Sequence, residues 1–214
     1  TVSSIAMPGR RRRKALTNES FDPILFDQIV TGNINFINKA ILFATRKKYL
    51  NTLKSLLSIP NIKFNYSDND GNSAFLVAAK LGHLACLQQL AATKGVNVNY
   101  TNPDGETAFI LAVVHDHAKC LDFLLNLNDV NKLHSNIYDD TALSYSAKLG
   151  RLSCLKVLLK SPEIDINIKD ESGNTAILLS ALSGRFEVLK YLCSIGVDYN
   201  VCNDSGNTPL IYSA

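Results

Sequence analysis

The sequence contains no hydrophobic run long enough to cross a membrane. Its longest apolar stretches, at residues 74–79 and 109–114, are far shorter than the roughly 18 residues that a membrane-spanning helix needs. No apolar stretch of signal-peptide length follows the first basic run, at residues 10–14, so secretion by a cleaved signal is not supported. We therefore expect an intracellular protein, cytoplasmic or nuclear, with no membrane partner.

Cysteine is scarce, and the five cysteines are an odd number. Three of them recur at intervals of 34 residues: Cys86, Cys120 and Cys154. The next equivalent position is Val188, and a position shared by cysteine and valine is typical of a small, buried core site. One repeat separates these thiols, which is too far for a disulfide. We expect Cys193 in the core and Cys202 in a hairpin, and a reducing compartment overall.

Positive charge is concentrated in one short run. The net charge is +3, but Arg10, Arg11, Arg12, Arg13 and Lys14 together contribute +5, which leaves −2 for the rest of the chain. The body therefore lacks the broad basic field that nucleic-acid binding requires. The run itself has three readings: a nuclear-import signal, a contact with a polyanion, or a solvated linker.

What the sequence does contain is an internal repeat. The turn residues Gly71, Gly105 and Asp139 begin equivalent segments that are 34 residues apart. The hydroxyl residues that follow these turns keep the same period, which shortens to 33 at the last step: Ser73, Thr107, Thr141, Thr175 and Thr208. A degenerate copy without the glycines begins near Ala40. A fixed period of this length is typical of a solenoid built from stacked units.

Each unit is predicted to form a turn, a short helix, a second turn and a second helix. The Asn/Asp-x-x-Gly start forms an Asx-type turn, and the hydroxyl residue after it can cap the next helix. Glycines at positions 82, 150 and 184 end that helix, and apolar residues at helical spacing follow. Helices this short cannot bury their apolar faces alone, so the units must stack on their neighbours.

The repeat resembles the ankyrin family over roughly residues 36–214, in about five units. The resemblance is carried by the 33- to 34-residue period, by Thr208-Pro209-Leu210 and by the Gly82-His83 pair. Asp116 departs from it, because a glycine is usual there. Tetratricopeptide arrays share the period but lack the Asn/Asp-x-x-Gly turn. The resemblance implies an all-α solenoid of helix-turn-helix units with short β-hairpin-like turns.

The repeat also divides the chain. We expect residues 1–19 to be a basic tail or linker and residues 20–66 to be an N-terminal helical cap with the degenerate first repeat. Ser20 is predicted to cap a helix that runs to about Thr31. Residues 67–214 are the ankyrin repeats, of which the last is incomplete. Because the array breaks off inside a helix at Ala214, we expect a piece of a longer protein.

The resemblance implies a partner-binding groove formed by the turn tips and the inward ends of the first helices. We expect its contacts to come from an apolar strip with polar flanks: Leu81, Asp104, Val114, His115, Ile137, Tyr138, Lys148, Leu149 and Leu182. Tyr138 is the favoured anchor, because tyrosine is enriched among binding hot spots and this turn position faces solvent.

The sequence offers no catalytic motif. His115, Asp116, His117 and Cys120 have metal-ligand chemistry, but a structural zinc site needs four convergent ligands and the repeat makes these side chains diverge. We find neither a phosphate-binding glycine loop nor a nucleophile elbow. We therefore expect that the chain is not an enzyme and that it binds no metal, cofactor or small-molecule substrate.

Two functions remain open. In the first, the chain is a monomeric scaffold or adaptor that binds another protein through its groove. In the second, it is the targeting or substrate-recruiting arm of a larger enzyme or a secreted bacterial effector, with the catalytic domain elsewhere.

Overall fold

The computed structural model describes residues 34–59, 62, 64 and 66–213. The basic run at residues 10–14 and the helix predicted for residues 20–31 lie outside the described residues. The described part contains five helix pairs and one further helix: α3 (Ile34–Arg46), α4 (Leu50–Leu57), α5 (Ala74–Lys80), α6 (Leu84–Ala91), α7 (Ala108–Val114), α8 (Ala118–Leu125), α9 (Ala142–Lys148), α10 (Leu152–Leu158), α11 (Ala176–Leu182), α12 (Phe186–Ser194) and α13 (Pro209–Ser213).

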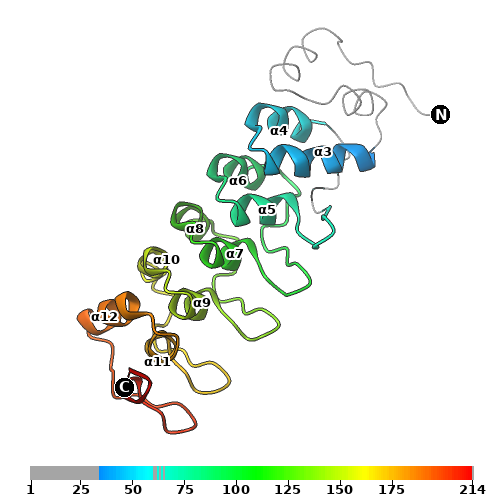
Figure 1. The fold of residues 1–214 in the computed structure, drawn as a ribbon. Coiled ribbons are helices and arrows are strands. Elements are labelled where there is room, and N and C mark those ends of the chain that lie inside the picture. Colours follow the sequence, from blue (N-terminus) through cyan, green and yellow to red (C-terminus); the bar gives the residue numbers. More distant parts are fainter. Residues whose placement is uncertain (1–33, 60–61, 63, 65, 214) are drawn as a thin grey trace, which may run out of the picture.

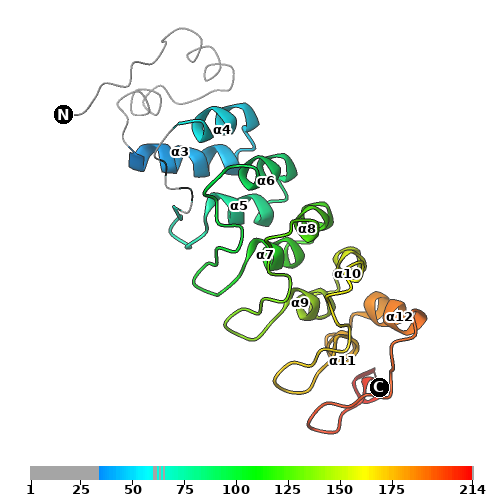
Figure 2. The ribbon, with the colours of Figure 1, turned by 180° about the vertical axis from the view of Figure 1, so that it is seen from behind.

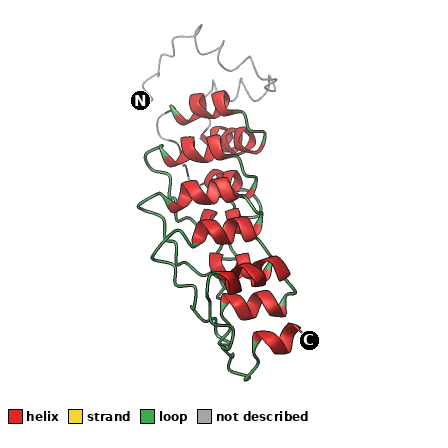
Figure 3. Cartoon of the chain, turned by 90° about the vertical axis from the view of Figure 1, so that its left-hand side faces the viewer, coloured by secondary structure: helices red, strands yellow, loops and turns green. Residues whose placement is uncertain are grey.

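The helix pairs stack into an elongated, two-layered array (Figures 1 and 2). The first helices of the pairs, α3, α5, α7, α9 and α11, form one layer, and the second helices form the other (Figure 1). Each first helix packs against the first helices of the adjacent units, as α9 does against α7 and α11. The loops between units project to one side of the stack (Figure 3). The predicted all-α solenoid is confirmed.

Hydroxyl side chains cap most of the first helices, as the repeat predicts. Ser73, Thr107 and Thr141 accept hydrogen bonds from backbone N–H groups three residues on, at 3.4, 3.3 and 3.2 Å. The prediction is wrong for Thr175, whose side chain makes no capping bond. Its Oγ1 is buried and has no hydrogen-bond partner among the described residues. The backbone turns there as in the other units, but the hydroxyl does not meet a donor.

The first helices end in left-handed residues. Gly82, Gly150 and Gly184 have φ angles of 69°, 72° and 65°. Asp116, which replaces the usual glycine, has φ 60°. Aspartate is among the few side chains that tolerate this region, because it can hydrogen-bond locally. The substitution therefore leaves the turn intact.

The core is a column of apolar side chains between the two helix layers. The predicted thiol column is confirmed, because Cys86, Cys120 and Cys154 are buried, as is Val188 at the equivalent position. Cys193 contradicts the prediction, because its thiol is exposed. It follows the buried Leu192 by one residue, a rotation of about 100° around α12, so it points away from the stack.

Polar side chains join each unit to the one before it. The residue that precedes each of α6, α8, α10 and α12 donates a hydrogen bond to a carbonyl at the end of the first helix in the preceding unit, at 2.8 to 3.2 Å: His83 to Thr45, His117 to Lys80, Arg151 to Val114 and Arg185 to Lys148. These carbonyls lie at the end of a helix, where no following turn supplies backbone N–H groups to them. The same position therefore links four consecutive interfaces in the same way.

Candidate partner-binding surface

Each turn tip is held by the side chain that opens it. In the fourth unit, Asn136 Oδ1 accepts hydrogen bonds from the backbone N–H groups of Tyr138 and Asp140, at 3.0 and 2.9 Å. The backbone N–H of Asp139 donates to the carbonyl of Asn136 at 3.1 Å. The second, fifth and sixth units repeat this pattern from Asp68, Asp170 and Asn203. In the third unit, Asn102 Oδ1 accepts the bond from the backbone N–H of Glu106. The tips are therefore well-defined turns.

Neighbouring tips also contact one another. The backbone N–H of Ile137 donates to the carbonyl of Asp104 at 3.1 Å, and Asp204 donates to Ser172 at 3.1 Å. A methyl group added to Gly71 would lie 2.3 Å from the ring of Pro103 in the next tip. The second tip therefore contacts the third, the third contacts the fourth, and the fifth contacts the sixth.

Most of the predicted apolar groove residues lie open to solvent. Tyr138 and Ile137 are 67% and 63% exposed, and Leu182 and Leu81 are 53% and 42% exposed. Asp104 and His115 are also exposed, whereas Val114 and Leu149 are half-buried. The structure therefore concentrates accessible apolar area at the tip of the fourth unit.

The tip and the end of the first helix meet in the fourth unit. Lys148, at the end of α9, forms an ion pair with Asp140 beside the turn. Both side chains are partly buried, so the pair is shielded from solvent more than an ordinary surface pair. Lys148 therefore holds two parts of the predicted groove together, and its charge is already matched within the chain.

The histidines near this surface are engaged in packing. The rings of His115 and His117 stack with their centroids 6.5 Å apart, and Nε2 of His117 donates to the Lys80 carbonyl. Burial, followed by the nearby Lys80 ammonium, lowers the pKa of His115. The lowered pKa favours the neutral form of His115. Within the part of the chain that the structure describes, no three His, Cys, Asp or Glu side chains group as metal ligands.

The comparisons with known proteins agree with this architecture. The family model described as ankyrin repeats, in three copies, matches residues 41–134, 77–170 and 162–214. The chain belongs to the ankyrin-repeat family. Ankyrin repeats are generally protein-interaction modules. The crystal structure of the ankyrin repeat protein EF0377 is similar to it with a TM-score of 0.72 at 21% identity, over 82% of this chain and 90% of that one. No curated protein shows significant sequence similarity to the chain.

The ankyrin register also accounts for carboxylates that the predicted residue set omitted. Asp139 stands on the fourth tip, next to the tip of the predicted Asp104, and Asp204 stands on the sixth tip; their place in the repeated turn is the signal that identifies them. Other exposed apolar side chains lie outside the predicted ankyrin groove, such as Phe186 on α12 and Tyr199 after it. Among the described helices of this ankyrin array, none is long and apolar enough to span a membrane.

Proposed function

We propose that the chain is a scaffold that binds a partner protein across its turn tips and the ends of its first helices. The observation that carries the proposal is the exposed Ile137–Tyr138 pair at the fourth tip. Exposed apolar groups with a polar surround usually mark protein contacts. Tyrosine is also among the residues that contribute most to binding when an interface is dry.

The rigidity of this surface supports the same function. The Asx bonds, the bonds between tips and the Lys148–Asp140 pair fix the backbone before any partner arrives. A preordered surface loses little conformational entropy on binding, so more of the contact energy appears as affinity. An array of linked units also offers a long surface, so one partner can contact several successive units.

The experiment is a quantitative pull-down from cell lysate with three proteins. The groove variant carries Tyr138→Ala and Leu182→Gln, because both side chains are well exposed and their loss leaves the core intact. We do not change Leu149, which is half-buried. The matched control carries Tyr199→Ala and Phe186→Gln, which remove a similar exposed apolar area outside the predicted groove.

We expect the wild-type protein and the control to capture a partner protein that the groove variant does not capture. Circular dichroism melts of all three proteins check that each one is folded. Equal capture by the groove variant and the wild-type protein would refute the assignment of the surface. Loss of the partner with the control variant alone would move binding to the α12 side of the stack.

A further inference from the structure

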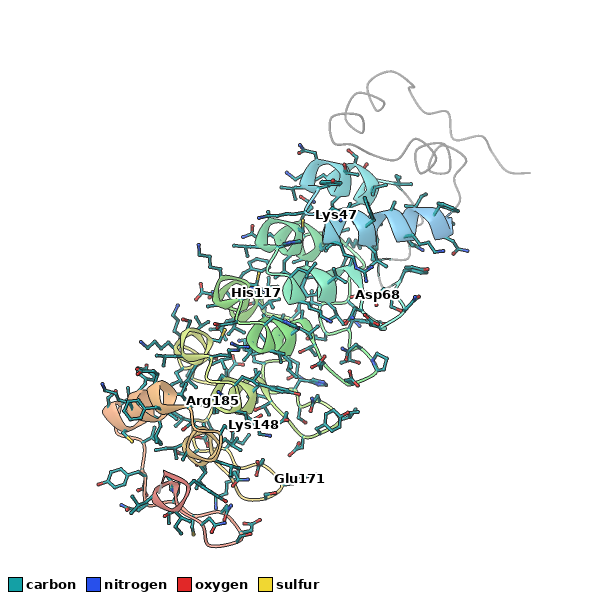
Figure 4. All side chains as sticks on the ribbon, in the orientation of Figure 1. Lys47, Asp68, His117, Lys148, Glu171 and Arg185 are labelled. Atoms are coloured by element: carbon teal, nitrogen blue, oxygen red, sulfur yellow. The ribbon has the colours of Figure 1, made fainter. Side chains whose placement is uncertain are left out.

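The tips carry a row of carboxylates whose charge is not matched within the described part of the chain. One side chain in each of the five turns makes no ion pair there: Asp70, Asp104, Asp139, Glu171 and Asp204. By contrast, Asp68 and Asp140, beside the tips, are paired with Arg46 and Lys148. Arg46 and Lys148 are used in these pairs, whereas Lys80 and Lys169 make no ion pair among the described residues. The carboxylates on and beside the tips still outnumber these cations, so the row is left as a negative edge. Figure 4 shows Asp68 and Glu171 on the loops that project from the stack.

Carboxylates stand on the same tip as the exposed Tyr138 and on the tip before it. In the fourth unit, Tyr138 takes the turn position that Asp70 and Asp104 hold in the two preceding units. Tyr138 is 67% exposed, with Asp139 beside it in the chain. The adjacent third tip presents Asp104, whose carbonyl bonds Ile137. An aromatic face next to carboxylates is a favourable site for an arginine or lysine side chain, which can contact the ring and the acids together.

We propose that this edge docks a basic, extended segment of the partner protein, with an arginine or lysine over Tyr138 and further cations on the neighbouring tips. This inference rests on the proposed function and specifies the chemistry of the partner. The apolar side chains between the cations would pack on Ile137 and on the ends of the first helices. Charge complementarity therefore selects this occupant over an acidic or wholly apolar one.

The repeat geometry fixes the spacing of the cations. Stacked helices lie roughly 8–10 Å apart, and the tips follow their units. An extended chain in the polyproline II conformation advances about 3.1 Å per residue with three residues per turn, so side chains at every third position share one face, about 9 Å apart. One partner residue in about every three therefore faces a new tip, and basic residues at every third position match the edge. A segment with the same basic residues in one block would match fewer tips.

The test is fluorescence anisotropy with synthetic peptides on the whole chain. One probe has arginine at every third position with leucine and serine between, and a second has the same composition with its arginines contiguous. The tip variant carries Asp104→Asn and Glu171→Gln. The matched control carries Asp129→Asn and Glu187→Gln, which remove the same charge from exposed positions away from the tips.

We expect the spaced probe to bind more tightly than the contiguous one. The tip variant should weaken its binding roughly three- to tenfold at low salt, because each exposed ion pair contributes modestly. The control should bind like the wild-type protein, and Tyr138→Ala should weaken binding about tenfold. Equal affinities for the two probes, or equal losses in the tip and control variants, would overturn the basic-segment inference. A partner lost in the pull-down with Tyr138→Ala and Leu182→Gln would then still support the proposed function.

Discussion

Two glycines in the same backbone conformation separate the cost of a left-handed turn from the cost of a crowded interface. Gly82 and Gly184 end equivalent helices with φ angles of 69° and 65°. Alanine at either position destabilises the folded state by roughly 1–2 kcal/mol, because its side chain must adopt a left-handed backbone conformation. Alanine also reduces the conformational entropy of the unfolded chain, which offsets roughly 0.5–1 kcal/mol of this loss. The net loss in the free energy of unfolding is about 1 kcal/mol at Gly184, where an added methyl meets nothing within 4 Å.

At Gly82 the added methyl would lie 2.5 Å from Nδ1 of His117, whose ring bonds the Lys80 carbonyl across the interface. The ring must move, and overpacking of this kind costs typically 1–3 kcal/mol. We therefore expect Gly82→Ala to destabilise the protein by about 1–3 kcal/mol more than Gly184→Ala. Urea unfolding measures this difference as a shift in midpoint, with the slope checked for a change in cooperativity.

A double-mutant cycle isolates the contact. His117→Ala removes the ring, so Gly82→Ala should cost only about 1 kcal/mol in that background, as Gly184→Ala does in the wild-type protein. Equal losses for the two glycine variants, or additive losses in the cycle, would refute the packing of His117 against Gly82.

Three further predictions concern the buried and exposed polar groups. Of the five thiols, Cys193 and Cys202 should react with a thiol reagent in the folded protein, as counted by mass spectrometry, while the buried three should react only after unfolding. Burial raises the pKa of Cys120 to about 11 from 9.0, so the folded state holds its proton longer. The contribution of this thiol to the free energy of unfolding is fully present below pH 9 and is lost as the pH rises toward 11. In urea titrations at several pH values, Cys120→Val should therefore lose less stability over this pH range than the wild-type protein. Thr107→Val should lose about 1 kcal/mol with its cap, whereas Thr175→Val should be neutral or stabilising in thermal melts, because it removes a hydroxyl with no partner among the described residues.

The repeat predicted the helices and turns because their signals are local. Asn136 bonds backbone groups two and four residues on, and Gly82 needs only its own φ angle, so the order of residues was enough. The same register gave the buried place of Cys154 from its spacing. These features depend on contacts that recur in every unit.

The details of the surface depend on contacts that differ between units. Asp68 is paired because Arg46 reaches it from 22 residues upstream, whereas Asp104 finds no cation within the described residues. Thr175 and Thr107 occupy the same position, but only Thr107 meets a donor. Cys193 lies one residue past a core position, and its direction follows from the rotation of α12. The repeat pattern does not predict the direction of a side chain or its pairing with a residue in another unit.

The central claim is that a partner binds along the turn tips, and hydrogen exchange of the complex with a partner captured by the wild-type protein tests it most directly. Amide exchange is read by mass spectrometry with and without that partner. We predict slower exchange on binding at residues 68–72, 102–106, 136–140 and 170–174, with little change in the second helices α8 and α10. Protection of α8 and α10 with unchanged exchange at the tips would contradict the account.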